Sequence, residues 1–180
     1  MVQKVALQIN CKLGGELWGC NIPLPHLMVV GVDVFHDPSR RLPSIAGIVS
    51  STNSAMSRWY SSTVFQAAHQ ELIDALKPAF VRAIKQYYQA NHAWPTKIIV
   101  FRDGVGDSQL SILAKYEAQQ FSDTFRHISD DYQPSFGFVV VQKRINTRIF
   151  ALGGREPDNP PPGTVCTRLL DVASNFNHVC

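Results

Sequence analysis

Two apolar runs that each lead into an aspartate constrain the fold of this chain more than any other feature. Residues 27–35 read LMVVGVDVF, with Asp33 near the end, and residues 97–101 read KIIVF and continue through Arg102 to Asp103. Near-continuous apolar runs of this length are typical of strands that are buried on both faces of a sheet. We therefore expect both runs to be central strands.

The apolar period changes between these two runs. Side chains that recur at three- and four-residue steps indicate an amphipathic helix, and they are Leu72, Leu76, Phe80, Ile84, Tyr87 and Tyr88. Pro78 would cost about 3 kcal/mol inside a helix, so either the helix kinks there or its regular part begins near Lys77. The same period over residues 108–128 predicts a second helix.

Four further segments have the composition of strands, and they are residues 5–10, 44–51, 58–66 and 136–142. A short spacer at residues 52–55 makes a tight connection plausible, so the segments from 27 to 66 resemble an antiparallel meander. From residue 27 onward, the order strand, strand, strand, helix, strand, helix, strand then predicts an α/β mixed sheet. Its antiparallel part continues into parallel strands through helical crossovers.

In the simplest arrangement, the strand that contains Asp33 lies beside the strand that leads to Asp103, and the two run parallel. Neighbouring strands lie about 4.8 Å apart, so the two carboxylates would face one another at the carboxyl edge, where α/β sheets bind ligands. Two such carboxylates repel unless a cation lies between them, and magnesium prefers these ligands. The alternative is that each aspartate only caps the turn that follows it.

Composition limits the class of protein. A chain of 180 residues with 45% hydrophobic and 17% charged residues is expected to form one packed domain rather than a disordered segment. The net charge of +3 weakly favours a polyanionic partner. Four cysteines without a C-x-x-C pair argue against a zinc site. No signal peptide and no run of about 20 apolar residues is present, so we expect a cytoplasmic protein without membrane contact.

Several motifs occur together along the chain. QINCKLGGELW occupies residues 8–18, GVD residues 31–33, and FRDGVGDSQL residues 101–110, and shorter matches include VQKR at 141–144 and PGTV at 162–165. Together they resemble the Piwi domain of the Argonaute/Piwi family, and the Piwi clade in particular. The resemblance covers residues 4–165 and implies a ribonuclease-H-like fold that uses a small-RNA guide to cut a paired RNA strand.

The resemblance also implies a metal site with Mg²⁺ or Mn²⁺ as cofactor. Asp33 and Asp103 would be two members of a set of four ligands, and Glu71 matches a mobile glutamate that completes the site. Two ions about 4 Å apart would activate a water molecule and stabilise the leaving oxygen. The alternative for Glu71 is a solvent-facing carboxylate in the first turn of a helix.

Several residues are candidates for contact with RNA. Lys12 matches a family lysine that anchors the guide's 5′ phosphate, and Gln8 is a weaker candidate in the same pocket. Lys143, Arg144 and Arg148 are expected to line the nucleic-acid channel. The alternatives are a solvated turn lysine and charges that protect an edge strand.

The resemblance divides the chain into three parts. Residues 1–26 would end the guide 5′-phosphate region, residues 27–165 would form part of the Piwi core, and residues 166–180 depart from the family pattern. The family takes its fourth ligand, usually a histidine, from a later segment. We therefore expect an incomplete Piwi domain that binds metal weakly and cuts poorly. A fragment, a splice form and a gene-model artefact all remain open as explanations.

The expected function follows from these parts. We expect piRNA-type guided binding of a complementary target RNA, with metal-dependent cleavage, in gene or transposon silencing. The expected partners are a small guide RNA, the target RNA and proteins of a silencing complex. The alternative is a non-catalytic RNA-binding or partner-docking module of such a complex.

Overall fold

A computed structural model describes residues 2–19, 21–37, 42–66, 76–103, 110–142, 148–151 and 157–164. The chain forms two compact units, Met1–Lys143 and Arg144–Cys180. The helices and strands of the described residues all belong to the first unit. In the second unit, Ala151 and Asp158 form an antiparallel bridge through two backbone hydrogen bonds of 2.9 and 3.2 Å.

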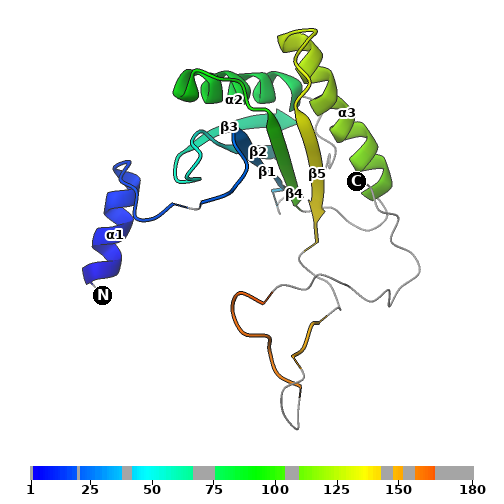
Figure 1. The fold of residues 1–180 in the computed structure, drawn as a ribbon. Helices are drawn as coiled ribbons and strands as arrows, with labels where there is room; N and C mark the ends of the chain where they lie inside the picture. Colours follow the sequence, from blue (N-terminus) through cyan, green and yellow to red (C-terminus); the bar gives the residue numbers. More distant parts are fainter. Residues whose placement is uncertain are drawn as a thin grey trace. The chain divides into compact units, whose positions relative to one another are not determined.

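The first unit is built on one sheet (Figure 1). Its described strands are β1 (Leu27–Phe35), β2 (Ser44–Ser51), β3 (Trp59–Gln66), β4 (Lys97–Asp103) and β5 (Ser135–Val141), in the order β3-β2-β1-β4-β5. β1 pairs with β2, and β2 with β3, in antiparallel fashion, whereas β4 runs parallel to both β1 and β5. The predicted meander and the predicted parallel pair are both confirmed.

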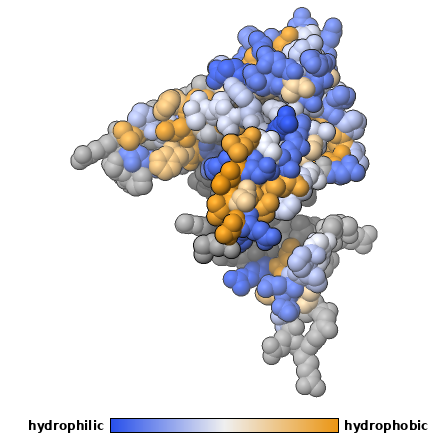
Figure 2. All heavy atoms as spheres, turned by 90° about the vertical axis from the view of Figure 1, so that its left-hand side faces the viewer, coloured by the Kyte–Doolittle hydropathy of each residue, from blue (hydrophilic) through white to orange (hydrophobic). Residues whose placement is uncertain are grey.

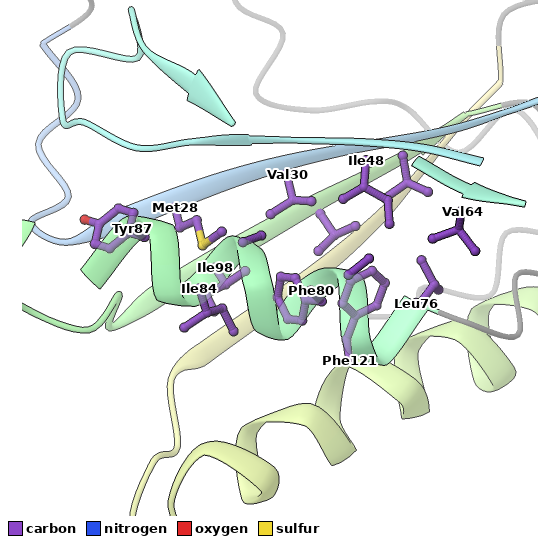
Figure 3. Close-up of a cluster of buried hydrophobic side chains, with 14 of the residues drawn as sticks. Met28, Val30, Ile48, Val64, Leu76, Phe80, Ile84, Tyr87, Ile98 and Phe121 are labelled. Carbon is purple, nitrogen blue, oxygen red and sulfur yellow. The ribbon is translucent and has the colours of Figure 1, made fainter. Parts of the chain in front are cut away.

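Two helices cover one face of this sheet, and they are α2 (Leu76–Asn91) and α3 (Leu110–Ile128). Alternate residues of β1 and β4, such as Val30 and Ile98, are fully buried beneath them. Figure 3 shows these side chains beside Phe80 of α2. The rings of Phe80 and Phe121 pack edge to face, with their centroids 4.6 Å apart. Within the described residues, none of the helices is long and apolar enough to span a membrane.

Pro78 lies two residues after Leu76, where the described part of α2 begins. The amides of a helix's first turn have no partner within the helix, so a proline there removes no hydrogen bond. Residues 67–75 lie outside the described residues, so a regular helix that begins near Lys77 and a kink at Pro78 both stay predictions. Leu72, which also entered the predicted helical pattern, lies outside the described residues.

The first element, α1 (Val2–Lys12), is a helix, so the prediction of a strand over residues 5–10 was wrong. The six apolar and polar residues of that segment were too few to separate the two periods, whereas Val2, Val5 and Ile9 follow helical steps. Gly14, with φ of 87°, ends the helix, and the Gly15 amide donates to the Asn10 carbonyl at 2.9 Å.

No residue of α1 is buried, although one side of the helix is apolar. Figure 2 shows that hydrophobic residues reach the surface of the molecule, and Val5 and Ile9 of α1 are among the exposed ones. Just after this helix, Glu16 accepts a hydrogen bond of 2.9 Å from Arg58 Nε.

Candidate functional site

The two aspartates occupy equivalent positions on neighbouring parallel strands. The register of β1 and β4 pairs Val32 with Arg102, so Asp33 and Asp103 are the next residues on the two strands. Val32 and Arg102 are buried on the helix-covered face. Because successive side chains of a strand alternate between faces, Asp33 and Asp103 lie on the opposite face of the sheet.

Local contacts orient the carboxylate of Asp33. This side chain is exposed, and its Oδ1 accepts a hydrogen bond of 2.8 Å from the Val34 amide. The Val34 amide belongs to β1 itself, so this bond is not the cap of a following turn, and the capping interpretation stays a prediction. Among the described residues, the second oxygen has no hydrogen-bond partner, so Asp33 can still bind a ligand through Oδ2.

The neighbouring strand leaves this carboxylate uncovered. Gly47 of β2 is the register partner of Asp33, and paired residues of antiparallel strands share a face. Among the described residues, only the Asp33 carbonyl oxygen would lie near a Cβ atom added to Gly47, at 4.0 Å. The absence of a side chain at Gly47 therefore keeps one flank of Asp33 open.

The donors of this site suit a divalent cation. Two carboxylates at neighbouring positions supply the hard oxygen ligands that Mg²⁺ and Mn²⁺ prefer, and a cation would relieve their mutual repulsion. Across the described ranges, no three His, Cys, Asp or Glu side chains come together as a metal cluster. Glu71, the predicted third ligand, lies outside the described residues, so its role stays a prediction.

A buried ion pair beside the site was missed from the sequence. Arg102 and Glu117 are both fully buried, and Arg102 Nε lies 2.9 Å from Glu117 Oε2. The sequence did contain a signal for this ion pair, because Arg102 follows Ile98 and Val100 at steps of two and therefore lies on the same helix-facing side of β4. Glu117 stands four residues before Phe121 on the buried side of α3. Two opposite charges at core positions were the pattern to recognise.

The predicted RNA-binding residues belong to different segments of the chain. Gln8 and Lys12 lie one turn apart on α1 and are both exposed, so Lys12 belongs to a helix and not to a strand end. Arg148 is exposed in the second unit. Lys143 and Arg144 lie outside the described residues. The channel that these residues were expected to line remains a prediction.

The sequence is similar to those of known proteins. A family model of the Piwi domain matches residues 1–175. Piwi-like protein 1 of Gallus gallus is 48% identical over 165 residues, which make up 92% of this chain and 19% of that protein. Protein argonaute-3 of Drosophila melanogaster is 46% identical over 177 residues, or 98% of this chain and 20% of that protein. The chain thus spans about a fifth of the length of these relatives.

Solved structures share the fold. Drosophila Piwi matches with a TM-score of 0.70 and 28% identity, over 86% of this chain and 21% of that protein. Kluyveromyces polysporus Argonaute, solved with a guide RNA, matches with a TM-score of 0.72 and 25% identity, over 84% of this chain and 19% of that protein. These similarities confirm the predicted ribonuclease-H-like mixed sheet.

Proposed function

Because the chain belongs to the Piwi domain family, we propose that it acts in small-RNA-guided silencing and holds divalent metal ions against RNA at Asp33 and Asp103. One observation carries this proposal: the two aspartates occupy equivalent positions near the carboxyl ends of the neighbouring parallel strands β1 and β4, on the face opposite to α2 and α3. Piwi-type guides and a complementary RNA target are the proposed nucleic-acid partners.

Each residue of this site would have its own role in metal binding. Asp33 binds through Oδ2 while the Val34 amide holds Oδ1, which limits rotation of the carboxylate. Asp103 supplies the second carboxylate from β4, and Glu71 is the proposed third ligand. When bound, Mg²⁺ or Mn²⁺ would polarise the scissile phosphate and activate the attacking water. The open flank at Gly47 leaves room for the RNA backbone.

Helix α1 is the proposed contact to the guide. Lys4, Gln8 and Lys12 follow one another at four-residue steps and therefore share one face of this exposed helix. Two lysines on one face add salt-dependent attraction for a phosphate, and Gln8 adds a hydrogen-bonding amide. The guide RNA in the Kluyveromyces polysporus Argonaute structure supports a nucleic-acid partner for this family.

The test compares metal binding with RNA cleavage. We expect Mn²⁺ binding by the full chain to weaken by at least about tenfold in Asp33→Asn and in Asp103→Asn, because each variant lacks one charged ligand. Magnesium-dependent cleavage of an RNA paired to a 5′-phosphorylated guide should disappear in both. Asp130→Asn makes the same change in charge at an exposed turn after α3 and should leave both quantities unchanged.

A non-catalytic RNA-binding module is the second candidate, and the exposed basic face of α1 favours it. The same variants separate the two functions. In an RNA-binding module, Asp33→Asn retains or increases RNA affinity, since it removes a negative charge, and no cleavage is seen in any variant. Unchanged Mn²⁺ affinity in both aspartate variants would rule out the proposed metal site.

A further inference from the structure

The charged pair behind β4 occupies a place that an apolar pair would fill more simply. Arg102 and Glu117 have fully buried side chains, and the other helix-facing residues of β4, Ile98 and Val100, are apolar. Taking two charges out of water opposes their attraction, so a buried ion pair is weak evidence for stability. A role other than stability would explain why charges lie at these two positions.

The guanidinium of Arg102 bonds both the Glu117 carboxylate and the backbone of Asp103. Arg102 Nε donates to Glu117 Oε2 at 2.9 Å, and Nη2 donates to Glu117 Oε1 at 3.4 Å. The remaining nitrogen, Nη1, donates to the backbone carbonyl of Asp103. A planar fork of donors allows arginine to bond a carboxylate and a carbonyl together, which the single ammonium of lysine cannot reproduce.

We propose that Arg102, held by Glu117, is a positioning residue that orients Asp103 for metal binding. The bond to the Asp103 carbonyl fixes the peptide plane at the end of β4, and this plane sets the direction of the Asp103 side chain on the opposite face. Glu117, a residue of α3, holds the Arg102 guanidinium by accepting its hydrogen bond. The inference rests on the proposed metal site and adds that Asp103 depends on a bond from behind the sheet.

The main test replaces the pair without leaving a lone buried charge. The double variant Arg102→Met/Glu117→Leu should remain folded, with a melting temperature close to that of the parent chain. Mn²⁺ binding by the full chain, measured from the resonance signal of free Mn²⁺, should weaken by about 10- to 100-fold, as metal sites do when a support of their ligands is removed. Asp103→Asn serves as the reference for a lost ligand.

If the double variant fails to fold, a second variant tests whether Arg102 positions Asp103. Arg102→Lys retains the charge opposite Glu117, but its single nitrogen cannot occupy the separate positions of Nε and Nη1, so it should fold and bind Mn²⁺ about tenfold more weakly. Thr124→Val is the matched control, because it removes another buried hydrogen bond of α3, from Thr124 Oγ1 to the Gln120 carbonyl at 2.8 Å. It should lower stability and leave Mn²⁺ affinity unchanged.

The outcomes separate this inference from the proposed function. Parental Mn²⁺ affinity in a folded Arg102 variant overturns the inference alone, provided that Asp103→Asn has lost binding. Parental affinity in Asp103→Asn itself removes the metal site, and the inference fails with it. If Thr124→Val weakens Mn²⁺ binding as much as Arg102→Lys does, the effect is general loosening and Arg102 is not a positioning residue.

Discussion

Tyr132 couples the stability of the first unit to alkaline pH. Its hydroxyl donates a hydrogen bond of 2.7 Å to the Pro95 carbonyl, and its ring packs at 5.8 Å from that of Phe125. Burial raises the pKa of Tyr132, and the nearby Tyr87 raises it further. The unfolded chain therefore releases this proton at a lower pH than the folded chain does.

We expect the free energy of unfolding to fall as pH rises above about 10, because the folded state then binds more protons than the unfolded state. Tyr132→Phe should lower stability by about 1 kcal/mol at neutral pH. Above pH 10 it should make the decline shallower, by at most about 1.4 kcal/mol per pH unit. Urea unfolding at several pH values measures both effects, and an unchanged slope would contradict the account.

Gly47 gives a prediction about access to the site. Gly47→Val places a β-branched side chain beside Asp33 on the open face, where the backbone leaves room for it. Strand propensity should hold or raise stability, by up to about 1 kcal/mol, while binding of RNA and Mn²⁺ should weaken.

Gly137→Val is the control, since it adds the same group on the same face of β5, beside Ile99 and away from the strand ends. Its stability change should match that of Gly47→Val, with binding unaffected. Equal losses of binding in both variants would show that the open face as a whole, and not the flank of Asp33, controls access.

Helix α2 allows a test of how the position of a proline affects stability. Lys85→Pro introduces a proline at an exposed interior position of α2 and should cost about 3 kcal/mol or more, because it removes a helical hydrogen bond. If the regular helix begins near Lys77, Pro78→Ala should change stability by less than about 1 kcal/mol. Urea unfolding of both variants gives the comparison, and similar losses would mean that Pro78 does not lie at a tolerant position.

Elements with a clear period were predictable from local sequence. The bounds of β1 and β2 agree with the apolar runs at residues 27–35 and 44–51, because burial on one or both faces leaves a direct trace in composition. α1 was not predictable in this way. Its residues are all exposed, and the six residues of the predicted strand were too short a window to separate the helical steps of Val2, Val5 and Ile9 from strand alternation.

The division of the chain into two units predicts that the first unit, Met1–Lys143, can fold by itself. The described core residues all lie between Leu27 and Phe138, within Met1–Lys143. A chain that ends at Lys143 should therefore melt within about 4 °C of the full chain, which corresponds to roughly 1 kcal/mol or less. Calorimetry of both chains measures this, and a larger drop would show that residues 144–180 contribute to the core.

The local sequence predicted the five strands of the sheet and the place of Asp33 and Asp103 near strand ends, because alternation and turn chemistry are local properties, but it wrongly predicted a strand where α1 forms. The register of β1 and β4, which places the two aspartates side by side, came from the fold. The fold alone showed that Arg102 pairs with Glu117, fifteen residues away, behind the site. Pairing between distant segments depends on packing and on the satisfaction of buried charges, and no local pattern records which partner is chosen.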